Sequence, residues 1–116
     1  MFSGAGAGSD SVESILPRAF AEKLKNTSGA QLIDVRSPQE FQSGHLRKAR
    51  NINVQGPGFQ SQAEKLKKDQ PVFVYCRSGG RSRMAAGQLA GMGFEEIYDL
   101  SGGIMSWMSK GLEVTQ

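Results

Sequence analysis

One segment of the chain combines residue types that can carry out covalent chemistry. Cys76 is the only cysteine in the sequence, and it directly follows the apolar run 71–75. The residues after it are, in order, Arg77, Ser78, Gly79, Gly80, Arg81 and Ser82. Cationic neighbours and a helix start lower the pKa of a thiol, and the thiolate is the nucleophilic form of cysteine. We therefore expect Cys76 to be an ionised, reactive thiol. The alternative is an inert, buried cysteine.

The two glycines favour an anion-binding loop around this thiol. Gly79 and Gly80 let the backbone curl so that successive N–H groups point inward. The helix expected at 82–92 points its positive end at the same hollow. We expect the backbone N–H groups of residues 77–82 to hold an anionic substrate or a sulfur atom bound to Cys76. The alternative is an ordinary turn with solvated arginines.

The positions of the arginines separate two classes of enzyme. Cysteine-dependent phosphatases have five residues between the cysteine and the arginine that grips phosphate. In this sequence the residue after such a gap is Ser82, because Arg81 comes one residue early and Arg83 one residue late. The loop is thus one residue short for a phosphate group, which favours a smaller cradle around a sulfur atom.

The elements around this loop alternate between strand and helix. The pattern predicts strands at 12–16, 31–35, 49–54, 71–75 and 96–100, and helices at 17–26, 38–44, 59–68, 82–92 and 103–110. Ser37 and Glu40 have the spacing of a capping box. On helix 82–92, the expected apolar residues are Met84, Ala85, Ala86, Leu89 and Ala90. The alternation predicts an α/β three-layer sandwich, a mostly parallel central sheet with helices on both faces. Ligands of such folds bind beyond the carboxyl ends of the strands.

Length and composition narrow the classes of protein. The 116 residues suit one domain, and we assign 1–11 to a flexible N-terminal tail and 12–116 to the folded domain. We expect no membrane span and no nucleic-acid partner, because no apolar run is long enough and the net charge is only +3. A single cysteine allows neither an internal disulfide nor a cysteine-rich zinc site.

The start of the chain does not have the features of a secretory signal, so a cytoplasmic location is favoured. A periplasmic location would require that a signal segment was removed.

Four separated motifs resemble those of single-domain rhodaneses, in the family's order, over residues 12–115. They are residues 32–36 with Pro38, Glu40 and Phe41; residues 44–46 with Ala49, Asn51 and Ile52; residues 74–82 with Ala85 and Ala86; and residues 100–104 with Trp107 and Gly111. By this resemblance the chain is identified as a member of the rhodanese family, with the activity of a thiosulfate-type sulfurtransferase.

The resemblance implies sulfur transfer in two half-reactions through a persulfide on Cys76. The donor would be thiosulfate or another persulfide, and the acceptor would be cyanide, a thiol or a protein cysteine. Arg77 and Arg81 are the candidates for attracting the anionic donor, and Arg81 is favoured because it closes the loop. No metal and no organic cofactor is required, and we expect a monomer.

The resemblance also implies supporting roles outside the loop. Asp34 and Arg36 would tie neighbouring loops together by hydrogen bonds. His45 could be a general base, but its Gly-His-Leu setting resembles a structural turn of the family. Glu40 is expected on the surface of its helix.

Other functions stay open beside sulfur transfer. A noncatalytic rhodanese-like binding module is one, although the intact cysteine loop argues against it. A sulfur carrier or redox sensor is another, and any disulfide it formed would be intermolecular. A phosphatase or arsenate reductase is the third, with the short loop counting against it.

Overall fold

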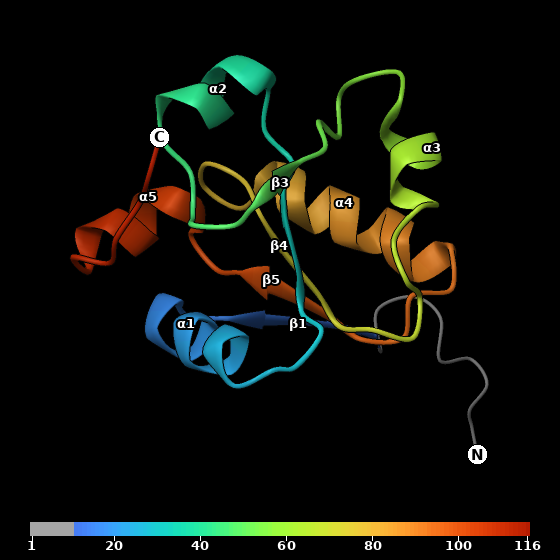
Figure 1. Ribbon diagram of the computed structural model, residues 1–116, viewed down its shortest axis with the longest axis horizontal. Coiled ribbons are helices and arrows are strands. Elements are labelled where there is room, and N and C mark those ends of the chain that lie inside the picture. The colour runs from blue at the N-terminus through green and yellow to red at the C-terminus, as the bar shows by residue number, and fades with distance from the viewer. Residues whose placement is uncertain (1–10) are drawn as a thin grey trace.

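Five parallel strands form one sheet at the centre of the protein (Figure 1). The structure is a computed structural model that describes residues 11–116, so the expected tail lies, except for Ser11, outside the described residues. In spatial order the strands are β1 (Val12–Ile15), β5 (Ile97–Leu100), β4 (Val72–Tyr75), β2 (Gln31–Asp34) and β3 (Arg50–Asn51). Each neighbouring pair is parallel. The predicted α/β class and the parallel sheet are confirmed.

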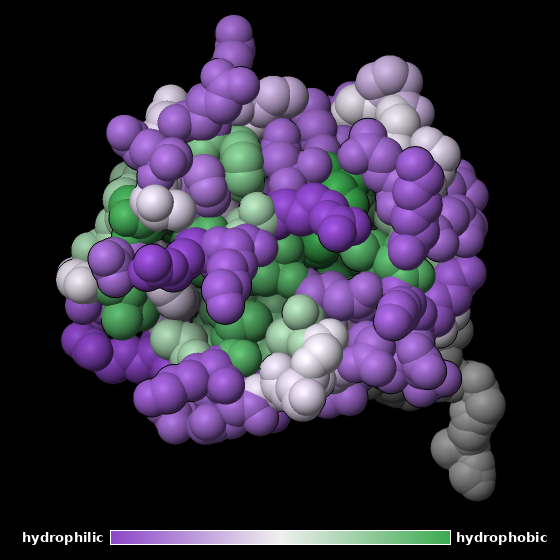
Figure 2. Space-filling view, in the orientation of Figure 1, coloured by the Kyte–Doolittle hydropathy of each residue, from purple (hydrophilic) through white to green (hydrophobic). Residues whose placement is uncertain are grey.

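Helices cover both faces of this sheet and give the molecule three layers (Figure 1). On one face, α1 (Pro17–Lys25) and α5 (Gly103–Ser109) pack over a core in which Phe20 meets the rings of Phe73 and Trp107 edge-on. On the other face, α3 (Phe59–Ala63) and α4 (Gly80–Gly91) close a second core. In the view of Figure 2, hydrophilic side chains form most of the surface, and hydrophobic ones are visible in the gaps between them.

The central strand β4 supplies side chains to both cores. Its four residues are completely buried. Because successive side chains of a strand point to opposite faces, Val72 and Val74 join the core under α3 and α4, whereas Phe73 and Tyr75 join the core under α1 and α5. A strand that is apolar on both faces is typical of the middle of a parallel sheet.

The strand register brings three loops to one edge of the sheet. Tyr75 at the end of β4 lies beside Asp34 at the end of β2, and Val74 lies beside Asp99 in β5. The loops that follow β2, β4 and β5 therefore begin side by side. α2 (Pro38–Ser43) starts from the first of them, with the predicted capping box: Ser37 Oγ accepts from the Glu40 N–H and a Glu40 carboxylate oxygen accepts from the Ser37 N–H.

Most predicted elements differ from the structure by one or two residues, but two are much shorter. β3 covers only Arg50–Asn51 rather than 49–54, although the N–H groups of Ile52 and Val54 still bond to carbonyls of the segment that leaves β2. α3 ends at Ala63 rather than residue 68. Beyond it, the N–H groups of Lys65 and Leu66 bond three residues back, and such tight turns do not extend a helix far.

The helix after the cysteine loop begins earlier than predicted, and one expected core residue is on the surface. α4 starts at Gly80 rather than Ser82. Its buried side chains are Ser82, Ala85, Ala86, Leu89 and Ala90, a stripe with helical spacing. Met84 lies outside that stripe and is 49% exposed, so its placement in the core was wrong.

Candidate active site

Cys76 lies at the carboxyl end of β4, and its sulfur points into the loop that precedes α4. The residue is only 1% exposed. The N–H of Gly79 donates a hydrogen bond of 3.0 Å to Sγ. Gly79 has a φ of 123°, a conformation that side chains rarely adopt. The glycine therefore allows the loop to turn a backbone donor back toward the thiol.

Further donors of the loop stabilise the ionised form of this thiol. The Oγ of Ser82 lies 3.5 Å from Sγ. Burial raises the pKa of Cys76, but hydrogen bonds from the Ser82 hydroxyl and from the backbone N–H groups of Ser82, Gly79 and Ser78 outweigh burial and lower the pKa overall. The reactivity of Cys76 stays a prediction, and three of the residues expected to supply backbone donors, Ser78, Gly79 and Ser82, act on its sulfur.

A buried carboxylate stands behind Ser82. The Ser82 hydroxyl lies 2.5 Å from Oδ1 of Asp99, and the hydroxyl of Ser14 donates to Oδ2 at 3.1 Å. Asp99 is 1% exposed. Sequence reasoning missed this residue. The signal was an acidic side chain between Tyr98 and Leu100 in an otherwise apolar strand, since buried carboxylates need polar partners.

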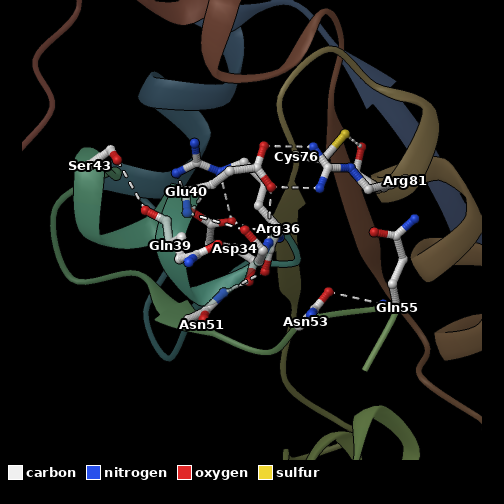
Figure 3. A network of polar contacts seen from close by, with 12 residues as sticks. Asp34, Arg36, Gln39, Glu40, Ser43, Asn51, Asn53, Gln55, Cys76 and Arg81 are labelled. Atoms are coloured by element: carbon white, nitrogen blue, oxygen red, sulfur yellow. Dashed lines mark hydrogen bonds and ion pairs between the residues drawn. The ribbon is translucent and has the colours of Figure 1, made fainter. Parts of the chain in front are cut away.

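Arg81 leaves the loop region to pair with α2. Its guanidinium makes two hydrogen bonds, of 2.7 and 2.9 Å, to the carboxylate of Glu40 (Figure 3). The hydrogen bond from Arg81 is the main reason why the pKa of Glu40 is lowered to about 2. Glu40 was expected only on its helix surface, and its partner could not be identified from the sequence. The pairing reduces the positive charge that Arg81 offers to a substrate.

Arg77 and Arg81 differ in what holds them. The Arg77 side chain is exposed and bonds to no group within residues 11–116. It lines a cavity of about 160 Å³ together with Arg36, Glu40 and the two methionines Met105 and Met108. Of the two predicted donor-binding arginines, Arg77 is the one with its charge unpaired among the described residues.

Asp34 and Arg36 form a buried ion pair at the end of β2. Nη2 of Arg36 is 2.6 Å from the Asp34 carboxylate and also donates to the carbonyl of Gly44. The side-chain amide of Asn51 donates to the carbonyls of both residues (Figure 3). These bonds join the loop after β2 to the end of β3 and the end of α2, as expected for the pair.

His45 is engaged in local structure. Its Nδ1 lies 2.8 Å from the carbonyl oxygen of Phe41, and its ring stacks on the Phe41 ring at 3.8 Å between centroids. Its backbone pairs with Thr115 near the end of the chain. These contacts account for the ring without a role in proton transfer at Cys76.

The start of α5 holds the backbone of the cysteine loop. The N–H of Ile104 donates to the carbonyl of Cys76, and the N–H of Met105 donates to that of Arg77. Gly103 has a φ of 64°, and a Cβ there would collide with the Arg77 carbonyl. The two glycines at the start of α5, Gly102 and Gly103, therefore allow the first turn of the helix to pack directly on the loop.

The described part of the chain has neither a metal-ligand cluster nor a membrane-spanning helix. Within residues 11–116, no group of three or more His, Cys, Asp or Glu side chains is placed to hold a metal ion. Among the same residues, no helix has the length and apolar character needed to cross a bilayer.

Comparison with known proteins gives a consistent family. The model of the rhodanese-like domain matches residues 17–110. The chain is 43% identical to the protein YqhL of Bacillus subtilis, over 70% of this chain and 63% of that protein. It is 38% identical to the thiosulfate sulfurtransferase GlpE of Vibrio cholerae, over 81% of this chain and 87% of that protein. A solved rhodanese-related protein from Thermoplasma volcanium superposes with a TM-score of 0.78 at 30% identity, over 89% of this chain and 97% of the other. The chain belongs to the rhodanese-like domain family.

Proposed function

We propose that the protein is a sulfurtransferase that carries a sulfane sulfur on Cys76. The observation that carries the proposal is the hydrogen bonding of the thiol. Sγ receives the Gly79 N–H at 3.0 Å in a loop that opens α4, and the pKa of Cys76 is lowered despite its burial. Such a site favours a thiolate and, after sulfur transfer, a persulfide anion.

The reaction proceeds in two half-reactions. The Cys76 thiolate attacks the outer sulfur of thiosulfate, a new S–S bond forms, and the bond to sulfite breaks. Sulfite leaves with the electron pair, and the negative charge of the transferred sulfur remains on the persulfide. A thiophilic acceptor such as cyanide then takes the outer sulfur, and the Cys76 thiolate is regenerated. Each half-reaction conserves charge without a redox partner.

The loop residues divide the binding work. Backbone N–H groups of residues 77–82 hold the anionic sulfur, as the bond from Gly79 to Sγ illustrates. Arg77 attracts the donor because its guanidinium is exposed and unpaired among the described residues. Arg81 contributes less, because Glu40 neutralises it.

Thiosulfate is proposed as the donor because a relative of 38% identity carries the name thiosulfate sulfurtransferase. A protein thiol is proposed as an acceptor, because the two loop residues that follow Cys76, Arg77 and Ser78, are exposed at the surface. We assign the catalytic domain to residues 12–116, because β1 from Val12 is part of the sheet.

Intact-protein mass spectrometry after incubation with thiosulfate tests the proposal. The expected result is a mass gain of one sulfur atom that cyanide removes, with release of thiocyanate. Cys76→Ser should show no gain and no turnover. Because Cys76 is the only cysteine, an adduct that survives in Cys76→Ser would exclude the mechanism. A wild-type protein that gains no mass from thiosulfate or from a persulfide donor would favour a noncatalytic binding module.

A further inference from the structure

A chain of buried polar side chains leads from the thiol into the interior. Cys76 Sγ lies 3.5 Å from Ser82 Oγ, and that oxygen lies 2.5 Å from Asp99 Oδ1. None of the three residues is more than 1% exposed. The sulfur-transfer reaction proposed above uses Cys76 but leaves Asp99 unexplained. A buried carboxylate one hydroxyl away from a nucleophilic thiol therefore calls for a physical role.

The hydroxyl of Ser82 has a single hydrogen atom, which limits what it can do. When Asp99 is ionised, Ser82 donates to the carboxylate, and its oxygen then accepts from a neutral Cys76 thiol. When Asp99 is protonated, the carboxylic acid donates to Ser82, and Ser82 can donate to a Cys76 thiolate. The direction of the hydrogen bonds thus couples the two ionisable groups.

We propose that Cys76 and Asp99 share one proton through Ser82, so that the Cys76 thiolate coexists with a protonated Asp99. The proton of Sγ moves to the Ser82 oxygen while the Ser82 proton moves to Oδ1 of Asp99. One negative charge is present before and after the transfer. The inference rests on the proposed function only in taking Cys76 as the nucleophile.

The surroundings of Asp99 favour this arrangement. Two anions joined by one buried hydroxyl would repel each other in a medium of low dielectric constant. Burial raises the pKa of Asp99 and outweighs the hydrogen bonds from Ser82 and Ser14 and the charge of Arg83, which lower it. Among the described residues, the positive charge of Arg83 lowers the pKa of Asp99. The charge of Cys76 raises the pKa of Arg81, which is paired with Glu40.

The sharing gives the thiol a proton acceptor that is shielded from water. The thiolate can form without releasing a proton to solvent, and Asp99 keeps that proton while the persulfide anion is present. The Ser82 hydroxyl then continues to donate toward the sulfur. Asp99 acts through Ser82 and is a positioning residue in this scheme.

Infrared spectroscopy of the resting protein tests the proton location directly. At a pH where ultraviolet absorbance shows the Cys76 thiolate, a protonated carboxylic acid band should be present in the wild type and missing in Asp99→Asn. The band should weaken in Cys76→Ala at the same pH, because the Asp99 pKa falls once the neighbouring thiolate is removed. A thiolate without the acid band, or an acid band whose pH dependence is the same in wild type and Cys76→Ala, would overturn the proposal.

A second variant remains informative if Asp99→Asn does not fold. Ser14 donates to Asp99 from the edge strand β1, so Ser14→Ala should weaken the ionised carboxylate and move the shared proton toward Asp99. The thiolate absorbance and the rate of iodoacetamide alkylation should rise at a fixed pH at which the Cys76–Asp99 pair has already lost one proton, because that proton loss then falls more on the thiol. Ser109→Ala, on the surface of α5 with its hydroxyl bonded to Ser106, is the matched control and should change neither.

A folded Ser14→Ala protein with an unchanged or slower alkylation rate would contradict the sharing. These measurements use no sulfur donor. They can therefore fail while the persulfide mass gain is still observed, and the reverse outcome is equally distinguishable.

Discussion

The guanidinium of Arg81 and the carboxylate of Glu40 form a two-point ion pair that joins the first turn of α4 to α2. Both side chains are less than one third exposed. The pair fixes the loop of Cys76 against α2, and it withdraws an arginine from the proposed donor site. Arg81 therefore positions the site more than it attracts substrate.

Removing the carboxylate of this pair should alter donor binding. Glu40→Gln leaves Arg81 without its counter-charge, so kcat/KM for thiosulfate should rise several-fold at low ionic strength, and the rise should shrink with added salt. Steady-state kinetics at two salt concentrations measure this. Glu64→Gln, which removes a surface carboxylate paired with Lys68, is the control. A lower kcat/KM in Glu40→Gln would mean that the pair's positioning role outweighs its charge.

Arg77 should carry the electrostatic attraction for the donor. Arg77→Ala is expected to raise KM for thiosulfate about tenfold with little change in kcat, the size of one charge-assisted hydrogen bond. Arg18→Ala is a suitable control, because Arg18 lies on α1 and bonds to the Lys110 carbonyl. An unchanged KM in Arg77→Ala would remove this residue from the donor site.

The same ion pair predicts how stability depends on pH. The pKa of Glu40 is lowered from its ordinary value of 4.5 to about 2 in the folded protein, chiefly by the hydrogen bond from Arg81. A depressed carboxyl pKa stabilises the folded state above the unfolded pKa, and this stabilisation is lost as the pH falls through the folded value. Urea unfolding should show wild type more stable than Glu40→Gln near neutral pH, with the difference shrinking between about pH 4.5 and pH 2. A difference that is constant over this range would contradict the assignment.

Gly103 should be essential for the fold of the cysteine loop. Gly103→Ala places a methyl group against the Arg77 carbonyl and forces a side chain into the left-handed region. We expect a loss of about 1–3 kcal/mol in the free energy of unfolding. Gly87 is the matched control, because it lies within α4 with open space around its Cβ position. Gly87→Ala should instead stabilise the protein by about 0.5–1 kcal/mol. Chemical denaturation of the two variants separates these outcomes, and an equally stable Gly103→Ala would show that the loop and α5 can move apart.

Local chemistry accounts for what could be predicted from the sequence. The order of strands and helices follows from hydrophobic spacing, and the start of α2 follows from Ser37, Pro38 and Glu40, because a capping box involves only neighbouring residues. The hydrophobic spacing of the neighbouring strand and helix also predicts the position of Cys76 between β4 and α4. The lengths of β3 and α3 could not be predicted from the sequence. The tight turns that follow Ala63 bring Leu66 into the core, and such packing depends on the tertiary structure.

The functional partners of the loop were decided by tertiary structure alone. Arg81 meets Glu40 across 41 positions, and Ser82 meets Asp99 across 17. Hydrophobic periodicity shows that β2, β4 and β5 exist, but it does not reveal their register at the shared edge. Only that register determines which charged groups face one another once water is excluded. The sequence by itself therefore determined the candidate nucleophile and the order of residues in its loop, whereas the packed sheet decided which arginine is neutralised and which carboxylate lies behind the thiol.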